Sequence, residues 1–260
     1  MSVRALLKRT VTKALEVTGR TPEEIAYEHF PVFLMEVLTK YLRVECYGME
    51  NIPKRGPCIL IANHSGYMGF DAMVLGWEIF QSVRRVPRII AHKLWFLHPD
   101  ISVAAHRFGL VPATLGNGLN VLKRNQLLLL FPEGEEGNFK PSRLRYRLRR
   151  FRRGFVRLAL QTGAPIVPIA VIGAEETHLT LSQIRWAKPL LGIIVPVPLN
   201  VLPLPAKWSI YVGKPIRLRK NPAKAEDMAY VTELSRKIRH QLQQEIHAKL
   251  KGRKTIFLGI

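Results

Sequence analysis

Short apolar runs alternate along this chain with amphipathic segments. Three of the runs have the length of a buried strand and pass directly into polar loops that contain glycine, at 58–62, 126–131 and 164–171. Segments with helical spacing of apolar residues lie among and after them, at 71–77, 116–125, 154–162 and 221–250. Continuous apolar strands separated by helices predict an α/β fold, here with a mixed central sheet flanked by helices.

Two more segments complete the predicted layout. Alternation at 42–47 favours an edge strand, and the long amphipathic pattern from Asn221-Pro222 onward favours a packing helix. We therefore divide the chain into an N-terminal helical pair (1–40), an α/β domain (41–220) and a C-terminal packing helix with its tail (221–260).

The N-terminal helical pair has two interpretations. Residues 2–18 alternate basic and apolar positions, and the helix after Thr21-Pro22 carries large apolar residues over much of its circumference. One basic amphipathic helix and one apolar helix suit insertion into an anionic membrane interface, which is the interpretation we favour. A helical hairpin packed on the domain is the alternative.

The loop after the first buried strand carries the candidate chemistry. Asn63 and His64 stand where that strand ends, and Asp71 stands where the next helix begins, with Gly66 and Gly69 between them. Histidine can take a proton from a hydroxyl near neutral pH, and a carboxylate on its other ring nitrogen fixes the tautomer. In a continuous helix the two residues would be about 10 Å apart, so they meet only across a folded loop, which glycine permits. A loop histidine with a separate capping aspartate is the alternative.

A second polar loop follows the strand at 126–131. It reads Phe131-Pro132-Glu133-Gly134-Glu135-Glu136-Gly137. Because the carboxyl ends of parallel strands meet at one edge of a sheet, Glu133 and Glu136 are expected near His64. The third strand contains Val167 and Pro168 and ends before Glu175.

These blocks, in this order, resemble the PlsC-like glycerolipid and lysophospholipid acyltransferase superfamily over about residues 45–215. The resemblance implies that His64 is the general base and that Asp71 orients it. It also implies that an acceptor hydroxyl attacks the thioester of acyl-CoA or of an acyl carrier protein, without an acyl-enzyme intermediate. Backbone N–H groups near Gly66 would then stabilise the oxyanion.

The same resemblance supplies the candidate substrate-binding residues. It assigns the acceptor site to the block at Glu133 and Gly134 and the substrate cleft to the block at Val167 and Pro168. The full candidate set is Asn63, Gly66, Phe131, Pro132, Glu133, Gly134, Glu136, Val167 and Pro168, with Arg149, Arg150, Arg152 and Arg153 from the arginine-rich segment that follows.

Two departures from the family pattern bear on the acceptor. Six residues separate His64 from Asp71 where four are usual, and this longer loop resembles a branch that includes mono- and diacylglycerol-type acyltransferases. Glu135 and Glu136 stand where lysophosphatidate acyltransferases often have Thr-Arg, whose arginine holds the acceptor phosphate. Because glutamate repels phosphate, a lysophosphatidate acceptor would need another cation here.

Seven arginines lie within 143–153, interleaved with Leu144, Tyr146, Leu148 and Phe151. As a membrane-surface or coenzyme A patch, they would bind headgroup or nucleotide phosphates. As a nucleic-acid stripe, they would bind phosphates while the aromatic rings stack on bases, and a solvated basic loop is the third interpretation. We favour the first, because the run follows the expected acceptor loop directly. A non-catalytic membrane- or nucleic-acid-binding protein is accordingly the competing function.

Composition narrows the expected partners. A net charge of +21 favours an acidic partner, which means nucleic acid, an anionic membrane face or phosphorylated ligands. No run of about 18 apolar residues is present, and the N-terminus lacks the features of a signal peptide, so we expect peripheral or monotopic association with the cytoplasmic face of a membrane. Nucleic acid is not an expected partner. Metal-ligand spacing is absent among Cys46, His92, His98, His106 and His178, so we expect no metal and no bound cofactor, with the acyl thioester as co-substrate.

The apolar, proline-rich segment 186–204 has two interpretations. It fits a lipid-facing loop with Trp186 and Trp208 near the membrane interface. It fits short core strands equally well, because its prolines exclude one long regular element.

Overall fold

The computed structural model describes residues 22–65, 69–253 and 255–257. The chain divides into two compact units, Met1–Tyr41 and Leu42–Ile260. In the first unit, the helix α2 (Pro22–Tyr41) exposes large apolar side chains, among them Phe33 and Val37. The helix predicted at 2–18 lies outside the described residues. Within the described ranges, no helix combines the length and the apolar character that crossing a bilayer requires.

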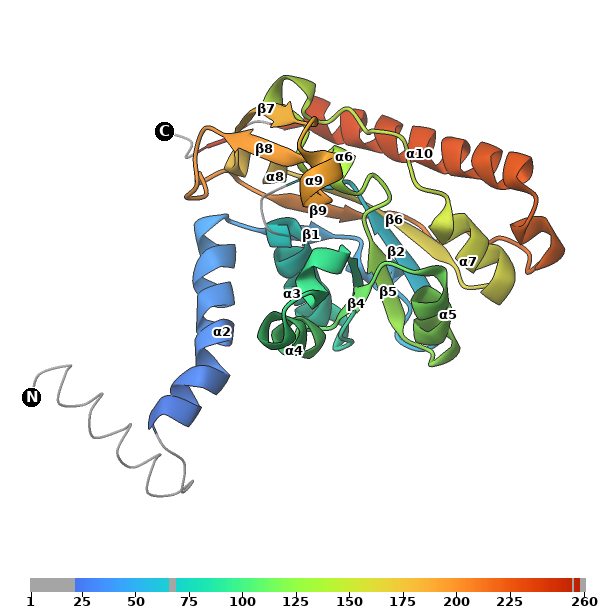
Figure 1. The fold of residues 1–260 in the computed structure, drawn as a ribbon, viewed down its shortest axis with the longest axis horizontal. Helices are drawn as coiled ribbons and strands as arrows, with labels where there is room; N and C mark the ends of the chain where they lie inside the picture. The colour runs from blue at the N-terminus through green and yellow to red at the C-terminus, as the bar shows by residue number, and fades with distance from the viewer. Residues whose placement is uncertain (1–21, 66–68, 254, 258–260) are drawn as a thin grey trace, which may run out of the picture. The chain divides into compact units, whose positions relative to one another are not determined.

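A mixed sheet forms the centre of the second unit (Figure 1). In spatial order its strands are β1 (Glu45–Tyr47), β9 (Ser209–Val212), β6 (Ile166–Ile172), β2 (Cys58–Ala62), β5 (Leu127–Leu130), β3 (Arg88–Ala91) and β4 (Leu110–Pro112). Neighbouring strands are parallel except β6 and β9, which are antiparallel. A separate antiparallel pair consists of β7 (Thr180–Ile184) and β8 (Val195–Pro198). The predicted fold class, a mixed sheet flanked by helices, is confirmed.

Three helices, α5 (Leu115–Lys123), α7 (Gly154–Thr162) and α10 (Met228–Lys251), pack on one face of the sheet (Figure 1). Their buried side chains form one apolar cluster with alternate residues of β2, β5 and β6. The other helical segments among the described residues of this unit are α3 (Phe70–Val83), α4 (Pro99–Arg107), α6 (Glu135–Asn138), α8 (Ala174–Thr177) and α9 (Lys188–Leu191), with the short turns η1 (Met49–Asn51), η3 (Lys93–Phe96), η4 (Ser142–Leu144) and η5 (Ala223–Ala225).

The central strands β6, β2 and β5 are buried along their whole length. In β2, Ile59 and Ile61 belong to the cluster beneath α5, α7 and α10, and Leu60, which points to the other face, is equally inaccessible. Burying each such side chain stabilises the fold by about 1.5–3 kcal/mol. The ends of these three neighbouring strands are therefore firmly positioned, and the candidate site is built there.

The sequence predictions for single elements have mixed outcomes. The edge strand at 42–47 is confirmed as β1, and the helix predicted at 154–162 is confirmed as α7. The predicted start of the C-terminal helix is wrong. Asn221 accepts a hydrogen bond from the Lys224 N–H, but only η5 follows it. The long helix begins at Met228, because the Asp227 carboxylate accepts the Ala229 and Tyr230 N–H groups and caps α10 there.

The segment 186–204 contains the short helix α9 and the strand β8 rather than one long element. Trp186 is exposed, as a lipid-facing loop requires. The expectation that Trp208 lies near a membrane interface is wrong. Its side chain is fully buried, and its indole N–H donates to Thr177 Oγ1 at 2.7 Å. Tryptophan favours a membrane interface because its indole N–H needs a polar partner. The Trp208 N–H already has one in the protein interior.

Candidate active site

The imidazole of His64 and the carboxylate of Asp71 meet across the loop between β2 and α3. His64 Nδ1 lies 2.7 Å from Asp71 Oδ2. The His64 side chain is 14% exposed and the Asp71 side chain is inaccessible, so the pair joins a buried carboxylate to a ring that solvent still reaches. With Asp71 ionised, Nδ1 carries the proton, and Nε2 is the ring nitrogen with a lone pair to accept one.

Local structure brings Asp71 into this position. Gly69 precedes α3 with a φ of 76°, a left-handed conformation that side chains other than glycine rarely adopt. Asp71 then lies in the first helical turn, where its Oδ1 accepts the Ala72 N–H at 2.8 Å and its Oδ2 accepts the Ser65 N–H at 2.7 Å. Backbone donors and the positive end of the helix dipole stabilise a carboxylate at this place. Gly66, the candidate oxyanion-hole position, lies outside the described residues.

Asn63 secures the strand end that carries His64. Its amide Nδ2 donates to the Val171 carbonyl at 2.9 Å, and its Oδ1 accepts the Val171 N–H at 2.7 Å. The side chain is fully buried and continues the pairing of β2 with β6 beyond the last paired residue, Ala62. The structure thus places Asn63 as a scaffold residue beside the site.

Glu133 links the loop after β5 to the His64 loop. Its carboxylate is buried, with Oε1 accepting the His64 N–H at 3.1 Å and Oε2 accepting the Arg149 N–H at 2.6 Å. Gly137 makes room for it, since a Cβ on Gly137 would lie 2.4 Å from the Glu133 Cβ. Phe131, from the same loop as Glu133, stacks its ring on the His64 imidazole, with ring centroids 4.3 Å apart.

A buried ion cluster adjoins this loop. Lys140 Nζ lies 2.9 Å from Glu175 Oε1 and 3.7 Å from Glu133 Oε2, and all three side chains are almost inaccessible. Burial raises the pKa of Glu175 to about 7, while the charge of Lys140 opposes that rise. Burial works to lower the pKa of Lys140, but Glu133 and Glu175 outweigh it, so this pKa is raised. Lysine therefore stays charged in the interior.

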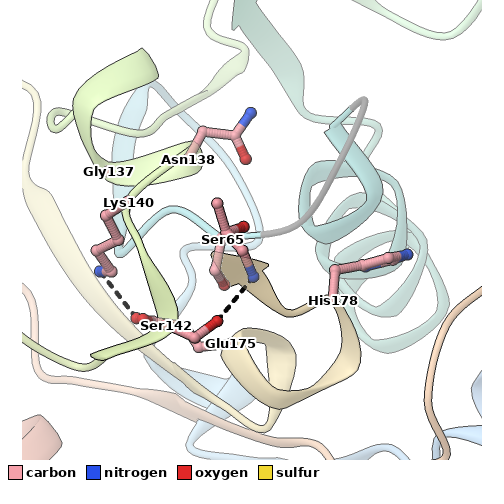
Figure 2. Close-up of a pocket in the computed structure, with 8 residues that line it drawn as sticks. Ser65, Gly137, Asn138, Lys140, Ser142, Glu175 and His178 are labelled. Carbon is pink, nitrogen blue, oxygen red and sulfur yellow. Dashed lines mark hydrogen bonds and ion pairs between the residues drawn. The ribbon is translucent and has the colours of Figure 1, made fainter. Parts of the chain in front are cut away.

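A cavity of about 10 Å³ lies beside this cluster, close to one water in size (Figure 2). Figure 2 shows Ser65, Lys140 and Glu175 around it, with a line joining the ion pair. Ser65 Oγ is buried and has no hydrogen-bond partner in the described part of the chain. A single water in this cavity would meet both the Ser65 hydroxyl and the ion cluster.

Sequence reasoning assigned no role to Lys140 or Glu175. Glu175 did carry a signal, because it follows β6 as His64 follows β2 and Glu133 follows β5, and these three strands are neighbours. Lys140 carried none, since one more basic residue in a basic loop does not reveal that it is buried.

The two glutamates that replace the expected Thr-Arg pair are matched by cations. Glu135 pairs with Lys188 and accepts the Ile194 N–H at 3.0 Å. Glu136 binds the Arg185 guanidinium at 2.7 Å. The segment around β7 and α9 is thereby attached to the loop after β5, and the repulsion expected from two uncompensated carboxylates is removed.

Three of the four apolar residues interleaved in the arginine-rich segment belong to the core, and Leu144 is only partly buried. Tyr146, Leu148 and Phe151 are buried in the main cluster. The rings of Tyr146 and Phe151 are therefore not available to stack on bases, which removes the feature that favoured a nucleic-acid stripe.

The four candidate arginines have different surroundings. Arg149 donates its backbone N–H to Glu133, Arg150 is exposed, and the Arg152 guanidinium lies close to Gly134. Arg153 Nη1 donates to Thr232 Oγ1 at 3.0 Å, on α10.

The other candidates lie inside the sheet or its loops. Val167 and Pro168 are buried within β6, and Pro132 is buried with its carbonyl accepting the Arg152 N–H at 2.7 Å. Direct substrate contact by these three stays a prediction. Among the described residues, no cluster of three or more His, Cys, Asp or Glu is placed to hold a metal ion.

Comparison with known proteins identifies the family. A model of the family described as Acyltransferase matches residues 43–172, half of the chain. The chain belongs to this acyltransferase family, which confirms the resemblance found in the sequence. The matched span begins before β1 and ends with β6, so it contains His64, Asp71 and Glu133.

The chain is also similar to individual proteins of other organisms. An uncharacterized protein of Mycobacterium tuberculosis is 37% identical over 232 residues, which cover 84% of this chain and 65% of that protein. The chain thus spans about 65% of the length of the mycobacterial relatives it matches. A human protein named DGAT1/2-independent enzyme synthesizing storage lipids is 26% identical over 173 residues, covering 66% of this chain and 53% of that protein.

A solved structure shares the fold. It is the crystal structure of the 1-acyl-sn-glycerophosphate (LPA) acyltransferase PlsC from Thermotoga maritima, with a TM-score of 0.54 and 16% identity over 96% of this chain and 90% of that one. At this identity the likeness establishes the fold of the chain and nothing finer.

Proposed function

We propose that this protein transfers a fatty acyl group from a thioester donor to the hydroxyl of a glycerolipid or lysophospholipid. The observation that carries the proposal is the 2.7 Å contact between His64 Nδ1 and Asp71 Oδ2, in a chain of the acyltransferase family. The names of two relatives, an LPA acyltransferase and an enzyme synthesizing storage lipids, support a glycerolipid acceptor.

In this mechanism His64 Nε2 takes the proton of the acceptor hydroxyl. The acceptor oxygen attacks the thioester carbonyl, and the tetrahedral intermediate collapses with loss of the thiolate. The imidazolium returns its proton to the departing sulfur, so the products are an ester and a free thiol. Asp71 holds the tautomer and stabilises the positive charge that His64 gains. A base of this kind contributes about 10²–10⁴-fold to the rate, and positioning of both substrates contributes further.

The buried scaffold explains how the base is held. The Asp71 carboxylate is hydrogen-bonded to the imidazole, Glu133 accepts the backbone N–H of His64, and Phe131 stacks on the ring. Three residues from two segments, the start of α3 after β2 and the loop after β5, therefore restrain both the backbone and the ring plane of His64. A catalytic base gains from such restraint because little reorganisation is left for the reaction itself.

We further propose that the donor is acyl-CoA or an acylated carrier protein and that the protein acts at the cytoplasmic face of a membrane. The net charge of +21 supports attraction to an anionic surface, and the exposed apolar residues of α2 support contact with lipid. No cofactor is needed for this chemistry, because the thioester supplies the activated acyl group.

The test is an acyl-transfer assay with labelled acyl-CoA or acylated carrier protein against a panel of lysophospholipids, monoacylglycerols and diacylglycerols. The wild-type protein is expected to acylate at least one acceptor, and His64→Ala to lose that activity by about 10²–10⁴-fold while its far-UV circular dichroism and liposome binding stay unchanged. His98→Ala is the matched control, since His98 is exposed and pairs with an exposed Asp100. Equal rates for wild type and His64→Ala would refute the proposal.

A further inference from the structure

A groove of about 300 Å³ opens on the surface next to the buried ion cluster. Its walls are formed by Lys140, Pro141, Arg143, Leu144, Arg149, Ser182, Gln183 and Arg185. The residues come from two parts of the chain, the stretch 140–149 at the start of the arginine-rich segment and strand β7 with the residue after it. None of the lining side chains is acidic, so the groove presents cations without a carboxylate inside it.

Two of its cations are uncompensated. Within the described part of the chain, the guanidinium groups of Arg143 and Arg149 have no salt-bridge or hydrogen-bond partner. The third, Arg185, is held in a fixed direction, because it donates to both oxygens of Glu136 and, through Nε and Nη2, to Gln183 Oε1. Lys140 at the edge of the groove already lies against the buried carboxyl groups of Glu175 and Glu133.

The groove also holds an unused hydrogen-bond donor. Gln183 Nε2 is buried and has no partner in the described residues, although the Oε1 of the same amide accepts two bonds from Arg185. Leaving a buried donor unpaired is costly, on the scale of a lost hydrogen bond, so such atoms usually have a ligand or water. An acceptor-rich anion in the groove would lie among the three residues that carry this donor and the two guanidiniums.

One carboxylate connects the groove to the catalytic loop. Glu133 accepts the backbone N–H of Arg149, which lines the groove, through Oε2, and the backbone N–H of His64 through Oε1. The backbone of Arg149, a residue that lines the groove, is therefore linked to the backbone of His64 through a single carboxylate. The expected acceptor-phosphate arginine is absent at Glu136, but the partner of Glu136, Arg185, contributes to this groove instead.

We propose that this groove binds a phosphate group of the substrate, with Arg143 and Arg149 as its main ligands and Gln183 and Arg185 beside them. Arginine forks match phosphate oxygens, and charge-assisted bonds of this kind are roughly twice as strong as neutral ones. The inference rests on the proposed acyl transfer and specifies it. Its phosphate belongs either to the nucleotide part of a coenzyme A donor or to the headgroup of a phosphorylated acceptor.

Binding without turnover tests the groove separately from the reaction. Isothermal titration of the full chain would use two probes, adenosine 3′,5′-bisphosphate for the donor and glycerol 3-phosphate for the acceptor. The Arg143→Gln/Arg149→Gln variant is expected to bind one of the probes at least tenfold more weakly than wild type. The matched control is Arg145→Gln/Arg147→Gln, two exposed arginines of the same segment that do not line the groove, and it should bind like wild type.

Each result has a defined reading. The probe that weakens identifies the source of the phosphate. Failure of both probes to bind the wild type, or equal weakening in the groove and control variants, would overturn the proposal. A groove variant that loses only its affinity for vesicles containing anionic phospholipid would also overturn it, because the arginines would then contact the membrane surface. His64→Ala should bind the probe normally, so loss of acyl transfer and loss of phosphate binding stay distinguishable.

Discussion

The buried carboxyl of Glu175 makes the stability of the fold depend on pH. Its pKa rises from 4.5 to about 7 because it is fully buried, despite the nearby Lys140. An acid whose pKa is higher in the folded state binds more protons there than in the unfolded chain between the two values, so the free energy of unfolding falls as pH rises through that window. This rise in pKa corresponds to about 3 kcal/mol, of which about 2–3 kcal/mol is expressed between pH 5 and pH 8.

Glu175→Gln replaces the protonated carboxyl by a neutral amide of the same shape and removes this titration. We expect the stability of the variant relative to wild type to increase by about 2–3 kcal/mol from pH 5 to pH 8, or by roughly 5–10 °C in melting temperature for a chain of this size. Urea unfolding of both proteins at pH 5, 6, 7 and 8 measures it. Glu245→Gln, at an exposed position of α10, is the control and should track the wild type. If the stability difference between Glu175→Gln and wild type were the same at every pH, the buried ion cluster would not be as described.

Two further substitutions test the scaffold around the base. Gly137→Ala should destabilise the protein by about 1–3 kcal/mol and reduce acyl transfer, because the new Cβ would lie 2.4 Å from the Glu133 Cβ. Urea unfolding measures the loss, with Gly116→Ala on α5 as the control, since a Cβ there meets open space. A neutral effect at both positions would contradict the close contact. Asn63→Ala removes both side-chain bonds to Val171 and leaves that backbone unpaired, so we expect a loss of about 2–4 kcal/mol in the same assay, and an unchanged midpoint would show that this link carries no stability.

The position of the site was predictable because polar residues follow buried strands. His64 and Glu133 come directly after apolar runs, and parallel strands bring such positions to one edge. The spacing of His64 and Asp71, with glycine between them, correctly indicated a folded loop. These signals are local in the sequence. They are clear because β2 and β5 are apolar and buried along their whole length, so the first polar residue marks the end of each strand.

The roles of individual residues were less predictable, because they depend on contacts between distant segments. That Glu133 shapes the acceptor site stays a prediction, but its contacts with the backbone N–H groups of residues 64 and 149 could not be read from the sequence. Trp208 was considered for the membrane interface, but Thr177, 31 residues away, provides its buried partner. Asn221-Pro222 is a suitable helix start by local sequence, but the helix begins six residues later. Asp227 caps it there, directly before Met228, the first of its regularly spaced apolar residues.

The pairing of Asp71 with His64 is the central claim, and the most direct measurement is a double-mutant comparison of acyl-transfer rates. The rate constants of His64→Ala, Asp71→Asn and the combined variant would be measured with the acceptor and donor identified in the panel assay. If the carboxylate acts only through the imidazole, the combined variant is as slow as His64→Ala alone, because groups that act as a unit are not additive. A combined variant slowed by the product of the two single losses would mean that Asp71 and His64 act independently, and it would contradict the account.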